Sequence, residues 1–373
     1  MESDRSTRLA VDIGGTFTDV VLETPRGTIT AKVLTTPKAP EEGVLEGVRE
    51  ALDASGAAPG SVEVVIHGTT LATNAIIERK GARTALITTD GFRDVLEIGY
   101  ETRYNQYDVF IDKPVPLVPR ERRLTVPERV DVRGHVLKAL DEEAVRAVAP
   151  ALADLGVESV AVGLLHSYAN PAHERRISEI LAETAPDLSV TLSSEACPEI
   201  REYERLTTAA ANAYVRPLMD RYLKRLESGL GELGIECPLL MMTSGGGLTT
   251  LATARRFPIR LVESGPAGGA ILATRIAAEQ GLAKAISFDM GGTTAKICLI
   301  DDFTAQRARE FEVDRQARFR KGSGLPLRIP VIEMVEIGAG GGSIARVDAM
   351  KQITIGPDSA GADPGPAAYG RGG

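Results

Sequence analysis

Apolar positions recur along this chain in two patterns, short runs typical of buried strands and longer stretches at helical spacing. Residues 8–34 are predicted to form three strands, separated by a glycine pair and by the turn at 25–27. A helix with acids in its first turn is predicted to start at Pro40, and a strand at 62–66 precedes a second helix at 71–79. Strands that alternate with helices at this spacing predict an α/β fold.

The alternation continues to residue 242 with one irregular stretch. Further strands are predicted at 82–88, 159–165, 189–192 and 239–242, and further helices at 141–155 and 173–183. Residues 99–130 break the pattern, but their clustered tyrosine and phenylalanine side chains favour a long ordered excursion over a linker. The longest helical stretch is predicted at 199–233, where Pro217 predicts a kink or a break into two helices. We place a hinge here, between predicted domains 1–198 and 199–373.

One turn occurs twice. Asp12-Ile13-Gly14-Gly15-Thr16 and Asp289-Met290-Gly291-Gly292-Thr293 share a formula of acid, apolar residue, two glycines and threonine, and each lies between two apolar strands. A glycine pair between strands predicts a hairpin, and its bare N–H groups and hydroxyl suit a phosphate chain. A single copy would indicate no more than a hairpin. Two copies predict two phosphate clamps, on two related domains, that face one nucleotide.

The second copy is followed by fewer predicted elements than the first. A third strand is predicted at about 308–313, and a strand at 332–337 leads into a glycine-rich loop at 338–343. The first copy, in contrast, precedes a full set of alternating strands and helices. The second domain is therefore expected to be incomplete, and the chain to be a fragment of a longer protein.

Two acids and a histidine are the catalytic candidates. Asp12 and Asp289 each end a strand beside a glycine turn, where they would hold Mg²⁺ through water or orient the attacking group. An acid that only caps the turn is the alternative. His67 lies at a strand-to-helix junction, a common place for a functional group in α/β folds, although a structural role is equally open.

The candidate nucleotide-binding residues come from both turns and from the loop at 338–343. Lys296 could neutralise phosphate charge or be solvated, and Asp19 at the matching position makes the two copies chemically unequal. The threonine hydroxyls could donate to phosphate or cap the turns. The full set is Gly14, Gly15, Thr16, Gly291, Gly292, Thr293, Thr294, Lys296, Gly340 and Gly341.

Composition narrows the choice of partners. The chain has 43 Lys+Arg against 51 Asp+Glu, a formal charge of −8, which argues against binding to nucleic acid. Cys197, Cys237 and Cys298 are too far apart for a disulfide framework or a cysteine metal motif. No apolar run approaches the length of a membrane span, and the start of the chain is polar, so a cytoplasmic location is expected.

Six segments, in order along the chain, resemble the hydantoinase A / 5-oxoprolinase family. They are residues 8–19, 67–75, 202–205, 263–269, 289–296 and 338–345. The resemblance implies an actin-like ATPase fold, shared with sugar kinases and heat-shock chaperones. It also implies ATP-dependent opening of a cyclic amide or imide, such as N-methylhydantoin or 5-oxoproline, through phosphorylation of the substrate carbonyl oxygen. A hydantoinase B-type subunit or domain is the implied partner, within a hetero-oligomer.

Two alternatives stay open. The same family includes the ATP-using subunit of acetone carboxylase, in which a ketone is activated and carbon dioxide is added. A non-catalytic ATP-driven switch is an alternative of another class, although a reductase activator would need closely spaced cysteines for an iron–sulfur cluster. Many oxoprolinase-like members carry a histidine shortly before the 338–343 loop. Here residues 333–337 offer carboxylates instead, so the resemblance does not imply a metal site at that histidine.

Overall fold

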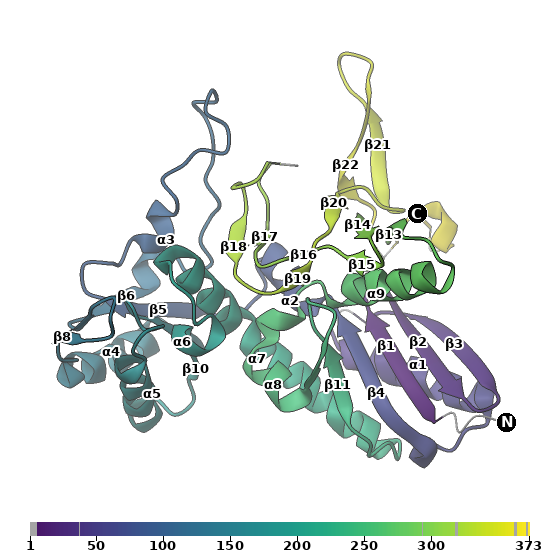
Figure 1. Cartoon of the computed structure of the whole chain (residues 1–373), viewed down its shortest axis with the longest axis horizontal. Coiled ribbons are helices and arrows are strands. Elements are labelled where there is room, and N and C mark those ends of the chain that lie inside the picture. The colour runs from purple at the N-terminus through teal and green to yellow at the C-terminus, as the bar shows by residue number, and fades with distance from the viewer. Residues whose placement is uncertain (1–5, 37, 293, 318–319, 362–363, 371) are drawn as a thin grey trace.

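The computed structural model describes residues 6–36, 38–292, 294–317, 320–361, 364–370 and 372–373 (Figure 1). These residues form an α/β structure with three main sheets arranged around two helices, α7 (Glu202–Glu232) and α9 (Ser264–Glu279). Helix α7 lies between the first and second sheets, and α9 lies between the first and third sheets (Figure 1). The two glycine turns belong to the first and third sheets.

The first sheet has six strands in the order β12-β11-β4-β1-β2-β3. Its strands are β1 (Thr7–Ile13), β2 (Phe17–Thr24), β3 (Gly27–Leu34), β4 (Val62–Thr69), β11 (Leu239–Met242) and β12 (Leu248–Thr250). Strands β1, β4 and β11 are parallel, and the β1–β2–β3 hairpins are antiparallel. This arrangement agrees with the actin-like fold that the resemblance implies.

Helices α1 (Pro40–Ser55) and α7 cover one face of the first sheet. The alternation along β1 explains this packing, because odd-numbered residues from Leu9 to Ile13 are buried while Arg8, Ala10 and Asp12 face away. Helix α1 ends at Gly56, which adopts a left-handed φ of 66°. Helix α2 (Leu71–Ile77) follows β4 directly, so the carboxyl ends of β1 and β4 and the start of α2 lie together.

The second sheet is wholly parallel, in the order β10-β9-β5-β6. Its strands are β5 (Thr84–Thr89), β6 (Arg123–Val126), β9 (Ser159–Gly163) and β10 (Ser189–Leu192). Helices α4 (Glu142–Asp154) and α5 (Ala172–Thr184) pack on one face and α7 packs on the other, so β5 and β9 are buried along their whole length. Both faces of a parallel sheet are normally covered in this way.

The third sheet carries the second glycine turn. It joins β13 (Lys284–Met290), β14 (Ala295–Asp301) and β15 (Thr304–Ala305), and β20 (Val335–Ile337) also pairs with β14. Smaller pairs are β7 (Arg129–Val130) with β8 (Val136–Lys138), β16 (Arg307–Ala308) with β19 (Val331–Ile332), β17 (Phe311–Val313) with β18 (Leu325–Leu327), and β21 (Ser343–Val347) with β22 (Ile353–Ser359). The short helices are η1 (Pro59–Ser61), α3 (Val95–Ile98), η2 (Arg120–Arg122), α6 (Ser193–Ala196), α8 (Leu251–Arg256), η3 (Pro258–Leu261) and η4 (Ala367–Tyr369).

Two secondary-structure predictions are corrected. The strand predicted at about 308–313 is divided between β16 and β17. The strand that pairs next to β14 is β15, because the chain turns at Asp302 and Phe303, whose φ values are positive. Helix α7 continues through Pro217 as one helix of 31 residues and does not break in two. Packing against both neighbouring sheets outweighs the loss of one backbone hydrogen bond at the proline.

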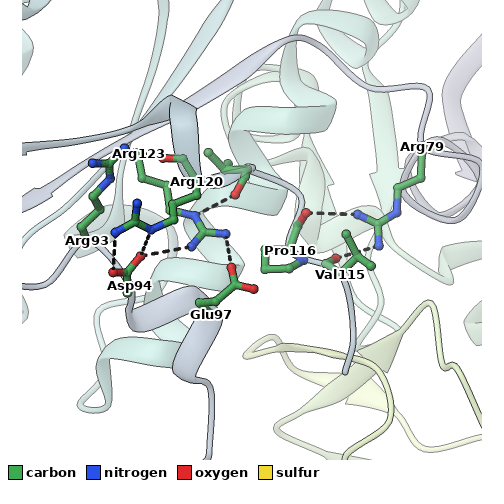
Figure 2. A network of polar contacts seen from close by, with 9 residues as sticks. Arg79, Arg93, Asp94, Glu97, Val115, Pro116, Arg120 and Arg123 are labelled. Carbon is green, nitrogen blue, oxygen red and sulfur yellow. Dashed lines mark hydrogen bonds and ion pairs between the residues drawn. The ribbon is translucent and has the colours of Figure 1, made fainter. Parts of the chain in front are cut away.

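The aromatic stretch after residue 98 has an anchored base and an exposed tip. Figure 2 shows the base, where the Arg79 guanidinium donates to the carbonyl oxygens of Val115, at 2.8 Å, and Pro116, at 3.5 Å. The Arg123 guanidinium, which is buried, also pairs with Glu97 at 2.8 Å. At the tip, Tyr107 and Phe110 are 96% and 88% exposed, so these two aromatic side chains lie largely in solvent.

The predicted division at residues 198/199 stays a prediction. Strands β11 and β12, which follow that division, complete the sheet that begins with β1. The first sheet therefore takes strands from both sides of the predicted boundary. Helix α7, which begins just after it, packs on the second sheet and also on the first, where Tyr222 is hydrogen-bonded to His67 of β4.

Candidate functional site

The two glycine turns are closed by equivalent backbone hydrogen bonds. In the first turn the Gly14 N–H donates to the carbonyl oxygen of Phe17 at 2.9 Å, and in the second the Gly291 N–H donates to that of Thr294 at 3.0 Å. Asp12 pairs with Asp19 across the first hairpin, and Asp289 pairs with Lys296 at the same register of the second. The hairpin prediction is therefore confirmed for both copies.

The two turns face each other. A Cβ atom placed on Gly292 would lie 3.2 Å from the Oγ1 atom of Thr16 and 3.4 Å from the hydroxyl oxygen of Tyr369. The carboxylates of Asp12 and Asp289 also lie close enough to repel each other, since Asp289 contributes to the raised pKa of Asp12. Residues about 277 positions apart in the sequence thus meet at one place, while Thr293 lies outside the described residues.

Several backbone N–H groups of the turns are available to a ligand. The N–H groups of Gly15, Thr16 and Gly292 donate to no other group in the part of the chain that the structure describes. Their side chains add only the hydroxyl of Thr16. Unpaired N–H groups in successive turn residues attract anions, so these turns offer donors suited to phosphate oxygens.

Asp12 lies at the centre of this arrangement. It retains contact with solvent, but its oxygens pack against glycine backbones, and a Cβ atom on Gly265 or Gly68 would lie 2.5 Å or 2.8 Å from Oδ1. Partial desolvation, followed by repulsion from Asp19 and Asp289, raises the pKa of Asp12 to about 6, and Lys32 and Lys296 oppose the rise. A carboxylate under such repulsion favours a nearby cation.

Lys296 and Glu263 form a largely buried ion pair beside the second turn. Burial lowers the pKa of Lys296, while the carboxylates of Glu336 and Asp12 oppose this effect. Glu263 adopts a left-handed φ of 62°, a conformation that costs a side-chain-bearing residue roughly 1 kcal/mol or more. Glu263 is the N-cap of α9, so the pair ties the start of that helix to β14.

Helix α9 is also tied to the first sheet. The Ser264 hydroxyl donates to the carbonyl oxygen of Thr69 at 3.0 Å and accepts from the Thr69 N–H at 2.9 Å. The Glu263 N–H donates to Oγ1 of Thr73 at 3.2 Å. These contacts hold the first turn of α9 against the end of β4 and the start of α2, directly beside Asp12.

The loop at 338–343 packs against the second turn. The Gly341 N–H donates to the carbonyl oxygen of Gly291 at 3.0 Å, and the Gly342 N–H donates to that of Gly292 at 2.7 Å. The Gly340 N–H donates to the Ser343 hydroxyl at 2.9 Å. The N–H groups of Gly340 and Gly341 are therefore occupied within the protein, and in this conformation the loop supports the turn.

His67 is part of the core. Its side chain has no exposed surface, its Nδ1 atom lies 3.1 Å from the carbonyl oxygen of Val11, and its Nε2 atom lies 2.7 Å from the Tyr222 hydroxyl. Burial lowers the pKa of His67 to about 4, so the ring is neutral at pH 7. Its position favours the structural alternative over a direct catalytic contact.

Comparison with known proteins then settles the relationship. The profile of the hydantoinase/oxoprolinase N-terminal region matches residues 8–185, and the hydantoinase/oxoprolinase profile matches residues 205–373. The chain belongs to the hydantoinase/oxoprolinase family. An uncharacterized protein of Methanocaldococcus jannaschii is 40% identical over 98% of this chain and 54% of its own length.

Two solved structures share the fold of this family member. The nucleotide-free structure of acetone carboxylase, from work on ATP-dependent acetone carboxylation, superposes with a TM-score of 0.82 at 27% identity, covering 96% of this chain and 52% of its own. The crystal structure of the ATP-dependent caprolactamase from Pseudomonas jessenii gives a TM-score of 0.80 at 33% identity, covering 98% and 53%. The chain thus spans about half the length of these relatives.

Sequence reasoning missed two contributors to the site of this hydantoinase/oxoprolinase chain. Glu263 and Ser264 entered the sequence analysis only within the segment 263–269 that resembles the family, yet they pair with Lys296 and with the Thr69 backbone. The isolated Glu-Ser pair before two helix-breaking residues, Gly265 and Pro266, was the available signal.

The site suits Mg²⁺ bound jointly by carboxylates, phosphates and water better than a metal ion bound by protein side chains alone. Within the described ranges, no group of three or more His, Cys, Asp or Glu side chains is arranged to bind a metal ion. Magnesium commonly uses one or two carboxylates together with phosphates and water, and Asp12 and Asp289 provide such a pair beside free N–H groups.

None of the helices in the described part of the chain has the length and apolar character needed to cross a bilayer.

Proposed function

We propose that this chain is the nucleotide-binding part of an ATP-dependent enzyme that opens a cyclic amide or imide. The observation that carries the proposal is the approach of the two glycine turns, with Thr16 against Gly292 and a carboxylate on each side. Similarity to an ATP-dependent caprolactamase over 98% of the chain supports both the use of ATP and the cyclic amide. Caprolactam is itself a cyclic amide.

Each part of the site has a role in this proposal. The phosphate chain binds the N–H groups of Gly15, Thr16 and Gly292, with the hydroxyls of Thr16, Thr293 and Thr294 as further donors. Asp12 and Asp289 would hold Mg²⁺, which neutralises phosphate charge when bound. Lys296, held by Glu263, adds a positive charge near the second turn.

The proposed reaction begins with attack on ATP. The carbonyl oxygen of the amide attacks the γ-phosphorus, the bond to ADP breaks, and a phosphorylated imidate forms. Water then adds at the former carbonyl carbon, and the ring C–N bond breaks as the nitrogen takes up a proton, which leaves an acyl phosphate. A second water hydrolyses the acyl phosphate to a carboxylate and inorganic phosphate. The turns serve the first step, because fixed N–H donors stabilise charge on the transferring phosphoryl group.

Nucleotide binding must also move the turns. A Cβ atom on Gly292 would already meet the Thr16 hydroxyl, so we expect a phosphate chain between the turns to require them to separate. The contacts of α9 with β4 and β14 lie beside this gap and would resist or guide the movement. We therefore expect nucleotide to alter the environment of Tyr369, whose hydroxyl oxygen would lie 3.4 Å from a Cβ atom on Gly292.

A ketone carboxylase subunit is the second candidate. The superposition on acetone carboxylase, with a TM-score of 0.82 over 96% of the chain, favours it as directly as the caprolactamase similarity favours the first. A ketone would replace the cyclic amide, and bicarbonate would supply the added carbon. A non-catalytic switch would hydrolyse ATP with neither substrate.

The partner and the cellular location also belong to this proposal. Two relatives are named as caprolactamase subunit alpha and acetophenone carboxylase gamma subunit, which supports a hetero-oligomer. We propose a hydantoinase B-type subunit or domain as the partner that completes the reaction, in the cytoplasm.

Phosphate release by the assembled enzyme tests the proposal. The chain, in its full-length protein and with its partner, is supplied with Mg-ATP and in turn with hydantoins, 5-oxoproline, caprolactam, and ketones with bicarbonate. Stimulation by a cyclic amide is expected. Stimulation only by a ketone with bicarbonate would assign the protein to the carboxylases, and turnover that no substrate changes would assign it to the switches.

A further inference from the structure

A cavity of about 420 Å³ lies behind the first glycine turn. Gly14 and Gly15 form part of its wall, and it extends between the start of α1, helix α2 and the middle of α7. The first turn therefore has one side that faces the second turn and another that faces the cavity. Thr16 points to the second turn, whereas a Cβ atom on Gly15 would lie 3.4 Å from the Asn74 amide nitrogen, on the cavity side.

The cavity is electropositive, although the whole chain is acidic. Lys38, Lys80, Arg221 and Arg225 line it against Glu41 and Glu78, a local balance of +2 in a chain of formal charge −8. Lys80 pairs with Glu78 at 2.6 Å and Arg225 pairs with Glu41 at 3.2 Å. These pairs leave Lys38 and Arg221, which have no hydrogen-bond or ion-pair partner among the described residues.

The rest of the lining suits a small ring. Leu71, Ala75 and Leu218 provide apolar surface, Tyr222 adds an aromatic wall, and Asn74 offers an amide. Small-molecule sites commonly have such a volume and such a mixture, mostly apolar surface with a few polar groups that fix orientation. Two unpaired cations beside apolar walls select an organic molecule that carries a negative charge.

We propose that this cavity binds the anionic group of a small organic substrate, with Lys38 and Arg221 as its cationic contacts and a carboxylate as the group they hold. The inference deepens the proposed function and rests on it. A cyclic amide anchored here would lie beside Gly14 and Gly15 of the first turn. Among cyclic amides, 5-oxoproline carries a carboxylate and caprolactam does not, so the cavity favours the first kind.

Titration calorimetry tests the proposal with three probes, in the presence and absence of a non-hydrolysable ATP analogue. They are 5-oxoproline, 2-pyrrolidinone, which has the same ring without the carboxylate, and inorganic phosphate. The variants are Lys38→Ala, Arg221→Ala and their combination, all at exposed positions. The matched control is Lys224→Ala, because Lys224 lies on the same helix, pairs with Asp220 and does not line the cavity.

We expect 5-oxoproline to bind at least tenfold more tightly than 2-pyrrolidinone. The double variant should lose at least tenfold in affinity for 5-oxoproline. Arg221→Lys should bind 5-oxoproline more tightly than Arg221→Ala, because it keeps the positive charge. Mg-ATP affinity should change less than twofold in every variant. Lys224→Ala should match the unaltered chain for all probes.

Three results would overturn the proposal. In the first, 5-oxoproline fails to bind a chain that still binds Mg-ATP, which leaves the proposed nucleotide function intact. In the second, phosphate binds through Lys38 and Arg221 while 5-oxoproline does not, which makes the cavity a phosphate site. In the third, 2-pyrrolidinone binds as well as 5-oxoproline. A chain that binds 5-oxoproline but no Mg-ATP would instead overturn the proposed function, on which the substrate role rests.

Discussion

The two glycine hairpins carry nearly the same turn in very different surroundings. In the first hairpin Leu9 and Leu22 pair across the strands and have no exposed surface, because α1 and α7 cover their face of the sheet. The equivalent pair in the second hairpin is Ile286 and Leu299, which are 67% and 46% exposed. The turns share the same closing hydrogen bond, whereas the sheets that hold them differ in burial.

This difference separates what the turn needs from what the fold needs. The hairpin hydrogen bond and the glycine pair are local, so they recur in both copies. The first turn is held by the large core of its sheet. The second has polar contacts from the loop at 338–343 and the Lys296–Glu263 pair, and a smaller core in which Cys298 packs with residues of α9. We therefore expect matched substitutions in the two hairpins to lower enzymatic activity equally but to lower the free energy of unfolding unequally.

The largest expected effect is on enzymatic activity, which matched substitutions in the two hairpins should lower to the same extent. Asp12→Asn and Asp289→Asn should each lower substrate-dependent ATP turnover of the assembled enzyme by about 100-fold or more, because a charge beside the transferring phosphate is lost. Phosphate-release kinetics measure this. Asp301→Asn, at the opposite end of the second hairpin, is the control and should retain the normal rate. A normal rate in only one of the two aspartate variants would break the equivalence of the turns.

Stability should distinguish the hairpins most clearly at the matched leucines. Leu22→Ala should lower the free energy of unfolding by about 3 kcal/mol, because it leaves a cavity in a closed core. Leu299→Ala should lower it by less than about 1 kcal/mol, since nearly half of that side chain already faces solvent. Urea unfolding of this chain gives both values. Equal losses at the two positions would show that the third sheet is as well packed as the first.

Two glycines of α9 test how the first turn is enclosed. Gly265→Ala places a Cβ atom 2.5 Å from the Asp12 carboxylate, and we expect a loss of about 1–3 kcal/mol in unfolding free energy together with weaker nucleotide binding. Gly269→Ala meets nothing within 4 Å and should be neutral or stabilising by up to about 1 kcal/mol. Thermal melts with and without Mg-ATP measure both. Indistinguishable melts would mean that α9 does not constrain Asp12.

The smallest expected effect is a pH dependence at Asp12. The pKa of this carboxyl rises from 3.8 to about 6 on folding, so the folded chain holds the proton more tightly and stability falls as the pH rises through about 4 to 6. Asp12→Asn removes the ionisation. It should add about 1 kcal/mol to the free energy of unfolding at pH 8, less than the pKa change alone implies because the carboxylate is partly hydrated, and nothing at pH 4. The same measurement of unfolding free energy against pH on Asp289→Asn compares the second turn with the first.

Local patterns made much of this fold predictable. The strands of both hairpins, helices α1 and α5, and the helical start after Glu263 follow from apolar periodicity and glycine or proline signals. Tertiary packing decided the exceptions. Pro217 remains inside α7 because that helix is covered on two sides, and β15 forms because the chain reverses at two residues with positive φ.

The sequence predicted which residues form the two turns of the site better than it predicted which residues they contact. The repeated formula located both turns, but no local signal placed Gly265 against Asp12 or Glu263 beside Lys296, because these partners meet only in the folded chain. His67 illustrates the same limit. It pairs in register with Val11 on the buried face of the sheet, and that register is not visible in either strand alone.

The central claim is that the two turns hold one phosphate chain, and the stoichiometry of nucleotide binding tests it most directly. Titration calorimetry of a non-hydrolysable ATP analogue with Mg²⁺ should give one nucleotide per chain. Gly15→Val and Gly292→Val, one on each turn, should each abolish that binding while the chain stays folded. Two nucleotides per chain, or normal affinity after either turn is altered, would contradict the account.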